Sequence, residues 1–204
     1  MKKGLLLIWL MSAFIFEGCS SDTAIREQIQ KESTGQGKVF EEFTDGNPVG
    51  GLCVLTIRVT MKTVNKGFYP FESKNSFHGK EEYPLVFNIG GQGIIWMAKG
   101  TPDTQQTIIN GKRNPEGGEG MKYSLVKTMM LRPGTYKIYI GLTEEKVQKE
   151  VSITLTKGRT SVLEFMPLYF PGRHNRNTGS FYRGLRDFDV FLDGKKVGTK
   201  PNKG

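Results

Sequence analysis

The sequence predicts an all-β fold, an antiparallel β-sandwich that follows an N-terminal signal and a short tether. Apolar residues recur with a period of two through most of the chain after residue 38, which is typical of strands with one buried face. The alternating segments are short and are separated by turns about eight to twelve residues apart, the spacing of a sandwich. The last alternating segment also ends in Asp193-Gly194, a strong hairpin signal.

The first predicted strand is Leu52–Thr63, in which Cys53, Leu55, Ile57, Val59 and Met61 alternate with Val54, Thr56, Arg58, Thr60 and Lys62. The pattern places Lys62 on the solvent face and Cys53 in the core as a small hydrophobic residue. Further strands are expected around Leu85–Ile89, in the apolar run Ile94–Met97 and over Tyr123–Leu131.

The clearest block of strands and turns runs from residue 131 to residue 165. Arg132-Pro133-Gly134 predicts a turn, because proline presets φ at one position and glycine accepts a positive φ at the next. Two alternating strands follow, joined at Thr143–Glu145, and Lys157-Gly158 turns the chain into a third at Val162–Phe165. Their buried faces consist of Tyr136, Ile138, Ile140 and Leu142, then Val147, Val151, Ile153 and Leu155.

The last predicted strand carries Phe188, Val190 and Leu192 on one face. Residues 190–201 (VFLDGKKVGTKP) resemble the opening hairpin of PEGA-type surface domains. Residues 131–136 (LRPGTY) and the two strands after them are similar to the second half of that family, in reversed order and without its name-giving motif. The resemblance covers about 50 residues and implies an immunoglobulin-like or transthyretin-like sandwich over residues 39–204, without a particular role.

The N-terminus is typical of a bacterial lipoprotein signal. Lys2 and Lys3 precede Leu5–Phe16, twelve uncharged residues, whereas a membrane-spanning helix needs about 20. Gly18-Cys19 resembles the end of a lipobox, although Glu17 is unusual there. We therefore predict that residues 1–18 are a signal peptide, that Cys19 carries acyl chains such as palmitate, and that residues 19–38 form a tether. The alternatives are an uncleaved anchor or an ordinary signal beside a chance cysteine.

Lipidation predicts a location and restricts the partners. Two or more acyl chains hold a protein stably at a membrane, and the serine after Cys19 resembles the pattern of outer-membrane lipoproteins. The chain has a net charge of +9, and removing residues 1–18 leaves +8. A basic chain favours anionic neighbours in the cell envelope. We expect the membrane, and an envelope protein or anionic glycan, as partners, and no nucleic acid.

No motif predicts catalysis, a cofactor or a metal. His78 and His174 stand in polar, Gly-rich segments without metal-ligand spacing, so both are expected to be exposed. Asp187, Asp189 and Asp193 share a strand face, which predicts a solvated surface rather than a calcium loop. The Gly-rich segments lack the residues and the strand–helix context of phosphate-binding loops, and 115–120 is expected to be a mobile loop.

A basic and aromatic segment near the C-terminus is the candidate binding site. Residues 173–204 contain eight Lys or Arg and three Asp. Arginine beside aromatic rings can bind phosphates, carboxylates or sugars, so we select Arg173, Arg176, Tyr182, Arg183 and Arg186. The alternative is a solubilising loop whose aromatic residues close the core.

The function expected from the sequence is a non-catalytic envelope lipoprotein that acts as a membrane-anchored interaction or assembly module. The alternative is a carbohydrate- or peptidoglycan-binding module that uses Trp96 together with the aromatic and basic segment 169–186.

Overall fold

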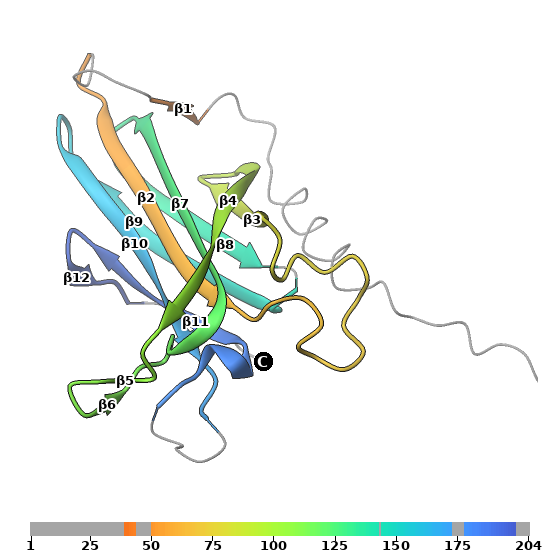
Figure 1. The fold of residues 1–204 in the computed structure, drawn as a ribbon. Helices are drawn as coiled ribbons and strands as arrows, with labels where there is room; N and C mark the ends of the chain where they lie inside the picture. The colour runs from red at the N-terminus through yellow and green to blue at the C-terminus, as the bar shows by residue number, and fades with distance from the viewer. Residues whose placement is uncertain (1–38, 44–49, 143, 173–177, 199–204) are drawn as a thin grey trace, which may run out of the picture.

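The computed structural model describes residues 39–43, 50–142, 144–172 and 178–198 (Figure 1). The strands are β1 (Phe40–Glu42), β2 (Cys53–Thr63), β3 (Glu82–Ile89), β4 (Gln92–Gln105), β5 (Ile108–Ile109), β6 (Lys112–Arg113), β7 (Gly118–Leu131), β8 (Gly134–Leu142), β9 (Val147–Leu155), β10 (Thr160–Tyr169), β11 (Leu185–Leu192) and β12 (Lys195–Lys196). The 3-10 helix η1 (Phe181–Arg183) precedes β11. The predicted all-β fold is confirmed. Cys19, the signal segment and the tether lie outside the described residues.

Ten strands form one sheet in the order β12-β11-β10-β2-β7-β4-β3-β8-β9, with β1 added beside β7. Neighbouring strands are antiparallel except β2 and β10, which run parallel in register from Thr160↔Val54 to Phe165↔Val59. This pair departs from the wholly antiparallel sheet that the sequence predicted. It arises because β10 enters its layer from the same end of the sandwich as β2.

Strand β4 connects two facing layers. Its first half, Gln92–Lys99, pairs with β3, whereas Lys99–Gln105 pairs with β7. One layer therefore contains β9, β8, β3 and the start of β4, and the other contains the end of β4 with β7, β2, β10, β11 and β12. Phe87 of β3 and Phe165 of β10 meet edge to face with ring centroids 6.1 Å apart, although their strands are not neighbours in the sheet. The layers thus enclose a common core.

The alternating pattern of the sequence accounts for this core. Inward-facing residues of β2 such as Leu55 and Ile57 are completely buried. Cys53 is buried in the core, as predicted, and its Sγ lies 3.0 Å from the Thr156 carbonyl. Between β9 and β11 the layers are linked by an ion pair of 2.7 Å from Lys149 to Asp187.

Within the described ranges, no helix reaches the length and hydrophobicity that a membrane span requires.

The two ends of the sandwich differ. At the turn end, short connections at 90–91, 132–133, 156–159 and 193–194 join consecutive strands. The hairpin predicted at Asp193-Gly194 is confirmed, with φ of 50° and 75° at the two turn residues. At the loop end, the strands are joined by 64–81, 106–117, 144–146 and the described parts of 170–184. Figure 1 shows the β5–β6 hairpin and the 64–81 loop at this same end.

Candidate functional site

The loop end is the candidate functional site because exposed apolar side chains gather there. Nine large hydrophobic residues of the described chain are exposed, and four of them lie within the long strands. The other five are Phe68, Phe71, Ile108, Ile109 and Phe170, which belong to three different loop-end segments. No residue of this kind is exposed at the described positions of the turn end.

Phe71 is the most unusual of these residues. Its side chain is fully exposed, and its backbone has φ of 68°, a left-handed conformation that strains any residue except glycine. The neighbouring Glu72 carboxylate fixes this turn. It accepts the Gly67 N–H at 2.6 Å and the Ser76 hydroxyl at 2.8 Å. The strained turn therefore holds the Phe71 ring in solvent on a fixed base, and such strain is concentrated at functional sites.

His78 binds Glu72 from the interior side of the same loop. Its Nδ1 lies 2.6 Å from Glu72, and its Nε2 lies 2.8 Å from Glu145 and 3.8 Å from Glu144. Both ring nitrogens face carboxylate acceptors, which requires the doubly protonated ring. Burial lowers the pKa of His78, but the hydrogen bonds and charges of these glutamates outweigh it and raise the pKa to about 9. The expectation of an exposed His78 is wrong, because only 8% of the residue is exposed.

The three glutamates connect His78 to the surrounding backbone. Glu144 accepts the Phe77 N–H at 2.7 Å, and Glu145 accepts the Leu185 N–H at 3.1 Å. Burial raises the pKa of Glu144 above its usual value, and the adjacent Glu145 charge adds to the rise. The pKa of Glu72 is lowered, since its hydrogen bonds outweigh the effect of burial. This polar cluster thus ties the 64–81 loop to the β8–β9 turn and to β11.

A second buried network supports the loop end through Lys62, which is 1% exposed although the alternation of β2 predicts a solvated side chain. Its Nζ lies 2.7 Å from Asp103 and donates to the carbonyls of Glu116 and Gly118 at 3.0 and 2.7 Å. Phe181 of η1 covers it, with Nζ 4.8 Å from the ring centroid. Lys62 is buried because the loop-end segments fold over the outer face of β2.

Tyr169 continues this network. Its hydroxyl accepts the Lys62 N–H at 2.7 Å and donates to Glu116 at 2.9 Å. Burial, together with the Glu116 charge, raises the pKa of Tyr169 well above its usual value. Glu116 also pairs with Lys122 at 2.9 Å. Residues 115–120 are therefore held by hydrogen bonds and contribute the start of β7, so the expected mobile loop is wrong.

The β5–β6 hairpin extends from the body of the molecule beside this network. Asn110-Gly111 forms its turn with φ of 51° and 73°. At its base, the Asn114 N–H donates to the Thr107 carbonyl at 2.9 Å, and the Asn114 side chain bonds Gln105 at 3.0 Å. Ile108 and Ile109 are exposed on one strand, opposite the exposed cations Lys112 and Arg113 on the other.

The predicted binding residues are only partly brought together. Arg173 and Arg176 lie outside the described residues. Tyr182 is half-buried, its ring packs against Phe68 with centroids 5.3 Å apart, and its hydroxyl accepts the Glu119 N–H at 3.1 Å. Tyr182 therefore serves as part of the structural base of the site. Its backbone carbonyl accepts the Tyr69 hydroxyl at 3.3 Å, which joins η1 to the 64–81 loop.

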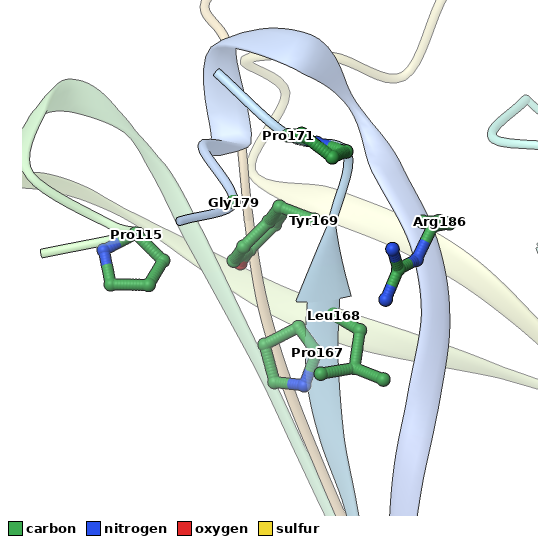
Figure 2. A pocket seen from close by; sticks show the side chains of 7 residues that line it. All are labelled: Pro115, Pro167, Leu168, Tyr169, Pro171, Gly179 and Arg186. Atoms are coloured by element: carbon green, nitrogen blue, oxygen red, sulfur yellow. The ribbon is translucent and has the colours of Figure 1, made fainter. Parts of the chain in front are cut away.

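Arg183 and Arg186 are both exposed but lie beside different segments. Burial and the nearby glutamates raise the pKa of Tyr69, and the charge of Arg183 opposes them, which places Arg183 beside the 64–81 loop. Arg186 instead lines a shallow cavity of about 210 Å³ (Figure 2). The other lining residues are Pro115, Pro167, Leu168, Tyr169, Pro171 and Gly179. The cavity thus presents one guanidinium among mostly apolar groups.

The remaining candidates have structural partners. Trp96 is 4% exposed and donates its indole N–H to Glu42 at 2.9 Å, so it cannot offer a face to a sugar. Asp187 and Asp189 pair with Lys149 and Lys196, each at 2.7 Å. Asp193 accepts the Val162 N–H at 2.7 Å. His174 lies outside the described residues. In the described part of the chain, no group of three or more His, Cys, Asp or Glu side chains is arranged to hold a metal ion.

Comparisons with protein-family models, with curated proteins and with solved structures gave no match to this chain. The resemblance to PEGA-type domains therefore stays a prediction, and the function has to be argued from the site.

Sequence reasoning missed Phe71, His78, Lys62 and the β5–β6 hairpin. The hairpin carried a readable signal, because Asn110-Gly111 between two short apolar and basic pairs is a favoured two-residue turn. Phe71 had no comparable signal, since its strained φ depends on hydrogen bonds to Glu72 from residues before and after it.

Proposed function

We propose that this protein is a non-catalytic lipoprotein of the cell envelope, anchored through Cys19, whose sandwich presents the loop end as an interaction surface. The observation that carries the proposal is the gathering of exposed apolar side chains at the loop end and their absence from the described turn end. Exposed apolar residues that share one region of a soluble surface mark interaction sites.

The base of this surface supports a binding role. The buried charges under it are paired with one another, Lys62 with Asp103 and His78 with its glutamates, so they stabilise loops rather than face a ligand. A binding surface gains affinity when its loops are already fixed in the bound conformation. The cavity beside Arg186 brings together no pair of carboxylates and no nucleophile next to a base.

The path of the chain fits the proposed tether. Phe40 of β1 pairs with Leu131 at the end of β7, so the chain enters the sandwich at the turn end. The loop end is therefore the part of the molecule farthest from this point of attachment. That arrangement leaves the loop end accessible to envelope components.

Photocrosslinking in intact cells tests the proposal. A benzophenone side chain placed at Phe71 or Ile108 should give a specific adduct with an envelope component. The same group at Met97, an apolar position within β4 that is 40% exposed, is the control and should give none. Equal adducts at all three positions, or none at any, would contradict the proposed surface. Acyl labelling that persists in Cys19→Ala would contradict the anchor.

Charge reversal separates the two described arginines. Arg183→Glu should weaken retention on anionic envelope material because Arg183 lies beside the 64–81 loop, whereas Arg186→Glu should have the smaller effect. The reverse order would place the binding surface at the cavity of Figure 2 instead.

A further inference from the structure

We infer that the loop end docks on an anionic lipid surface, with Phe71 and the two isoleucines of the β5–β6 hairpin inserted among the headgroups. The inference rests on the proposed function, because it assigns a partner to the same surface. A peripheral protein binds a bilayer through exposed apolar side chains that enter the interface and through cations that attract anionic headgroups. The loop end supplies both.

The apolar side chains project from two separate elements. Phe71 stands fully exposed at a tight turn, and Ile108 and Ile109 are 62% and 47% exposed on a two-stranded hairpin. Figure 1 shows the hairpin and the 64–81 loop as distinct extensions of one end of the molecule. A pair of projecting tips suits a soft, deformable partner such as a bilayer interface. A protein partner would need a hollow for each tip.

The exposed charge of the loop-end segments is mostly positive. In the described parts of the four loop-end segments, the exposed cations are Lys66, Lys74, Lys80, Lys112, Arg113, Lys146 and Arg183. Glu81 is the exposed acid of the same segments, and Glu82 and Glu119 are exposed just beyond them, at the starts of β3 and β7. The other glutamates are held below the surface, three of them by His78 and Glu116 by Lys122 and Tyr169. The internal pairing of these acids leaves the outer surface basic, and an anionic surface attracts it.

The inserted residues are also fixed in position. Glu72 holds the Phe71 turn through hydrogen bonds to Gly67, Ser76 and His78. Asn114 closes the base of the hairpin. Apolar side chains on mobile loops would fold back onto the protein to avoid water, whereas these loops keep them exposed. The tether does not prevent docking, since residues 20–38 reach about 60 Å when extended, farther than the length of β7, about 48 Å.

Vesicle sedimentation tests the inference on residues 19–204 carrying Cys19→Ser, a chain that includes every described residue and no acyl chain. This chain should sediment with phosphatidylglycerol-containing vesicles and much less with vesicles of phosphatidylcholine alone. Phe71→Ser combined with Ile108→Ser should reduce the bound fraction on anionic vesicles roughly tenfold or more. The control, Ile95→Ser combined with Met97→Ser, removes two apolar residues of β4 that are 48% and 40% exposed, and it should bind as the unmodified chain does.

The depth of insertion gives a second measurement. Trp96 is the one tryptophan in residues 19–204 and is buried. Phe71→Trp therefore adds a single exposed fluorophore, whose emission should shift to the blue on anionic vesicles and be quenched by brominated lipid. Unshifted emission, or control variants that lose binding as strongly as the loop-end variants, would overturn the inference.

The outcomes separate the two proposals. If the chain does not bind vesicles but photocrosslinks at Phe71 to a protein or glycan in cells, the lipid inference is wrong and the proposed function stands. If Phe71 gives neither vesicle binding nor a crosslink, both are wrong.

Discussion

The turn end and the loop end of the sandwich are built from different kinds of interaction. At the turn end, local chemistry decides the structure: Asp193-Gly194 and Gly90-Gly91 adopt positive φ and close hairpins between adjacent strands. At the loop end, the bonds join residues distant in sequence, such as Lys62 with Asp103 and Tyr69 with Tyr182. A turn can therefore change without affecting the rest of the fold, whereas a single loop-end residue supports several segments at once.

Lys62→Met should have the largest effect on stability. Methionine keeps most of the side-chain volume but leaves the Asp103 carboxylate and two backbone carbonyls without their donor. Removing one partner of a buried ion pair costs about 3–5 kcal/mol. Because the Asp103 side chain is 23% exposed and can be partly solvated, the free energy of unfolding measured with urea should fall by the lower end of that range, about 3 kcal/mol. The double variant Lys62→Met/Asp103→Leu should recover part of the loss. Equal unfolding free energies of Lys62→Met and the unmodified protein would show that the Lys62 network does not stabilise the fold.

His78 makes the stability of the loop end depend on pH. Its pKa is about 9 in the folded protein and 6.5 in the unfolded chain, so the folded state binds the proton more tightly. The resulting stabilisation is fully present below pH 6.5 and is lost as pH rises through about 9. After allowance for solvent screening, we expect a loss of about 2 kcal/mol between these values.

The control for this prediction is His78→Asn, which removes the titrating ring. The variant should be less stable than the unmodified protein at pH 6, and its unfolding free energy should change much less between pH 6.5 and pH 9. The same slope in both proteins would assign the pH dependence to other groups. Calorimetric or urea unfolding at a series of pH values measures both slopes.

This contrast explains what the sequence could and could not predict. The strands, the buried Cys53 and the Asp193-Gly194 turn follow from patterns within a few residues, and the structure confirms them. Lys62 has the spacing of a solvated residue, and only the segments that fold over β2 bury it. His78 looks like any loop histidine until Glu144 and Glu145 reach it from the β8–β9 turn.

The candidate site was predicted less completely than the fold. Tyr182, Arg183 and Arg186 were selected for composition, yet Arg186 lines the cavity and Arg183, the last residue of η1, does not. The exposed Phe71 belongs to a loop in which no sequence motif indicates a function. A strained backbone conformation results from the surrounding contacts and cannot be read from residue types.

Gly194→Ala tests the local character of the turn end. Its φ of 75° strains an alanine, although no atom lies within 4 Å of the added Cβ. We expect a loss of about 1 kcal/mol, confined to the β11–β12 hairpin, with no effect on pH dependence or on binding. Gly198→Ala is the matched control, because Gly198 lacks a positive φ and its Cβ would also meet nothing. A loss at Gly194 as large as that of Lys62→Met would remove the distinction between the two ends.

Phe71→Gly should have the smallest effect on stability and the opposite sign. Glycine accepts the φ of 68° without strain, and no packing is lost because the ring is fully exposed. The relief of about 1–2 kcal/mol is partly offset by the greater freedom of glycine in the unfolded chain, so a net gain of about 0.5–1 kcal/mol is expected. Phe71→Ala keeps the strain and should leave the unfolding free energy unchanged. Both variants should lose binding at the loop end to the same degree, since both remove the ring. A protein that becomes more stable as it loses binding would show that Phe71 is retained for contact with a partner rather than for folding.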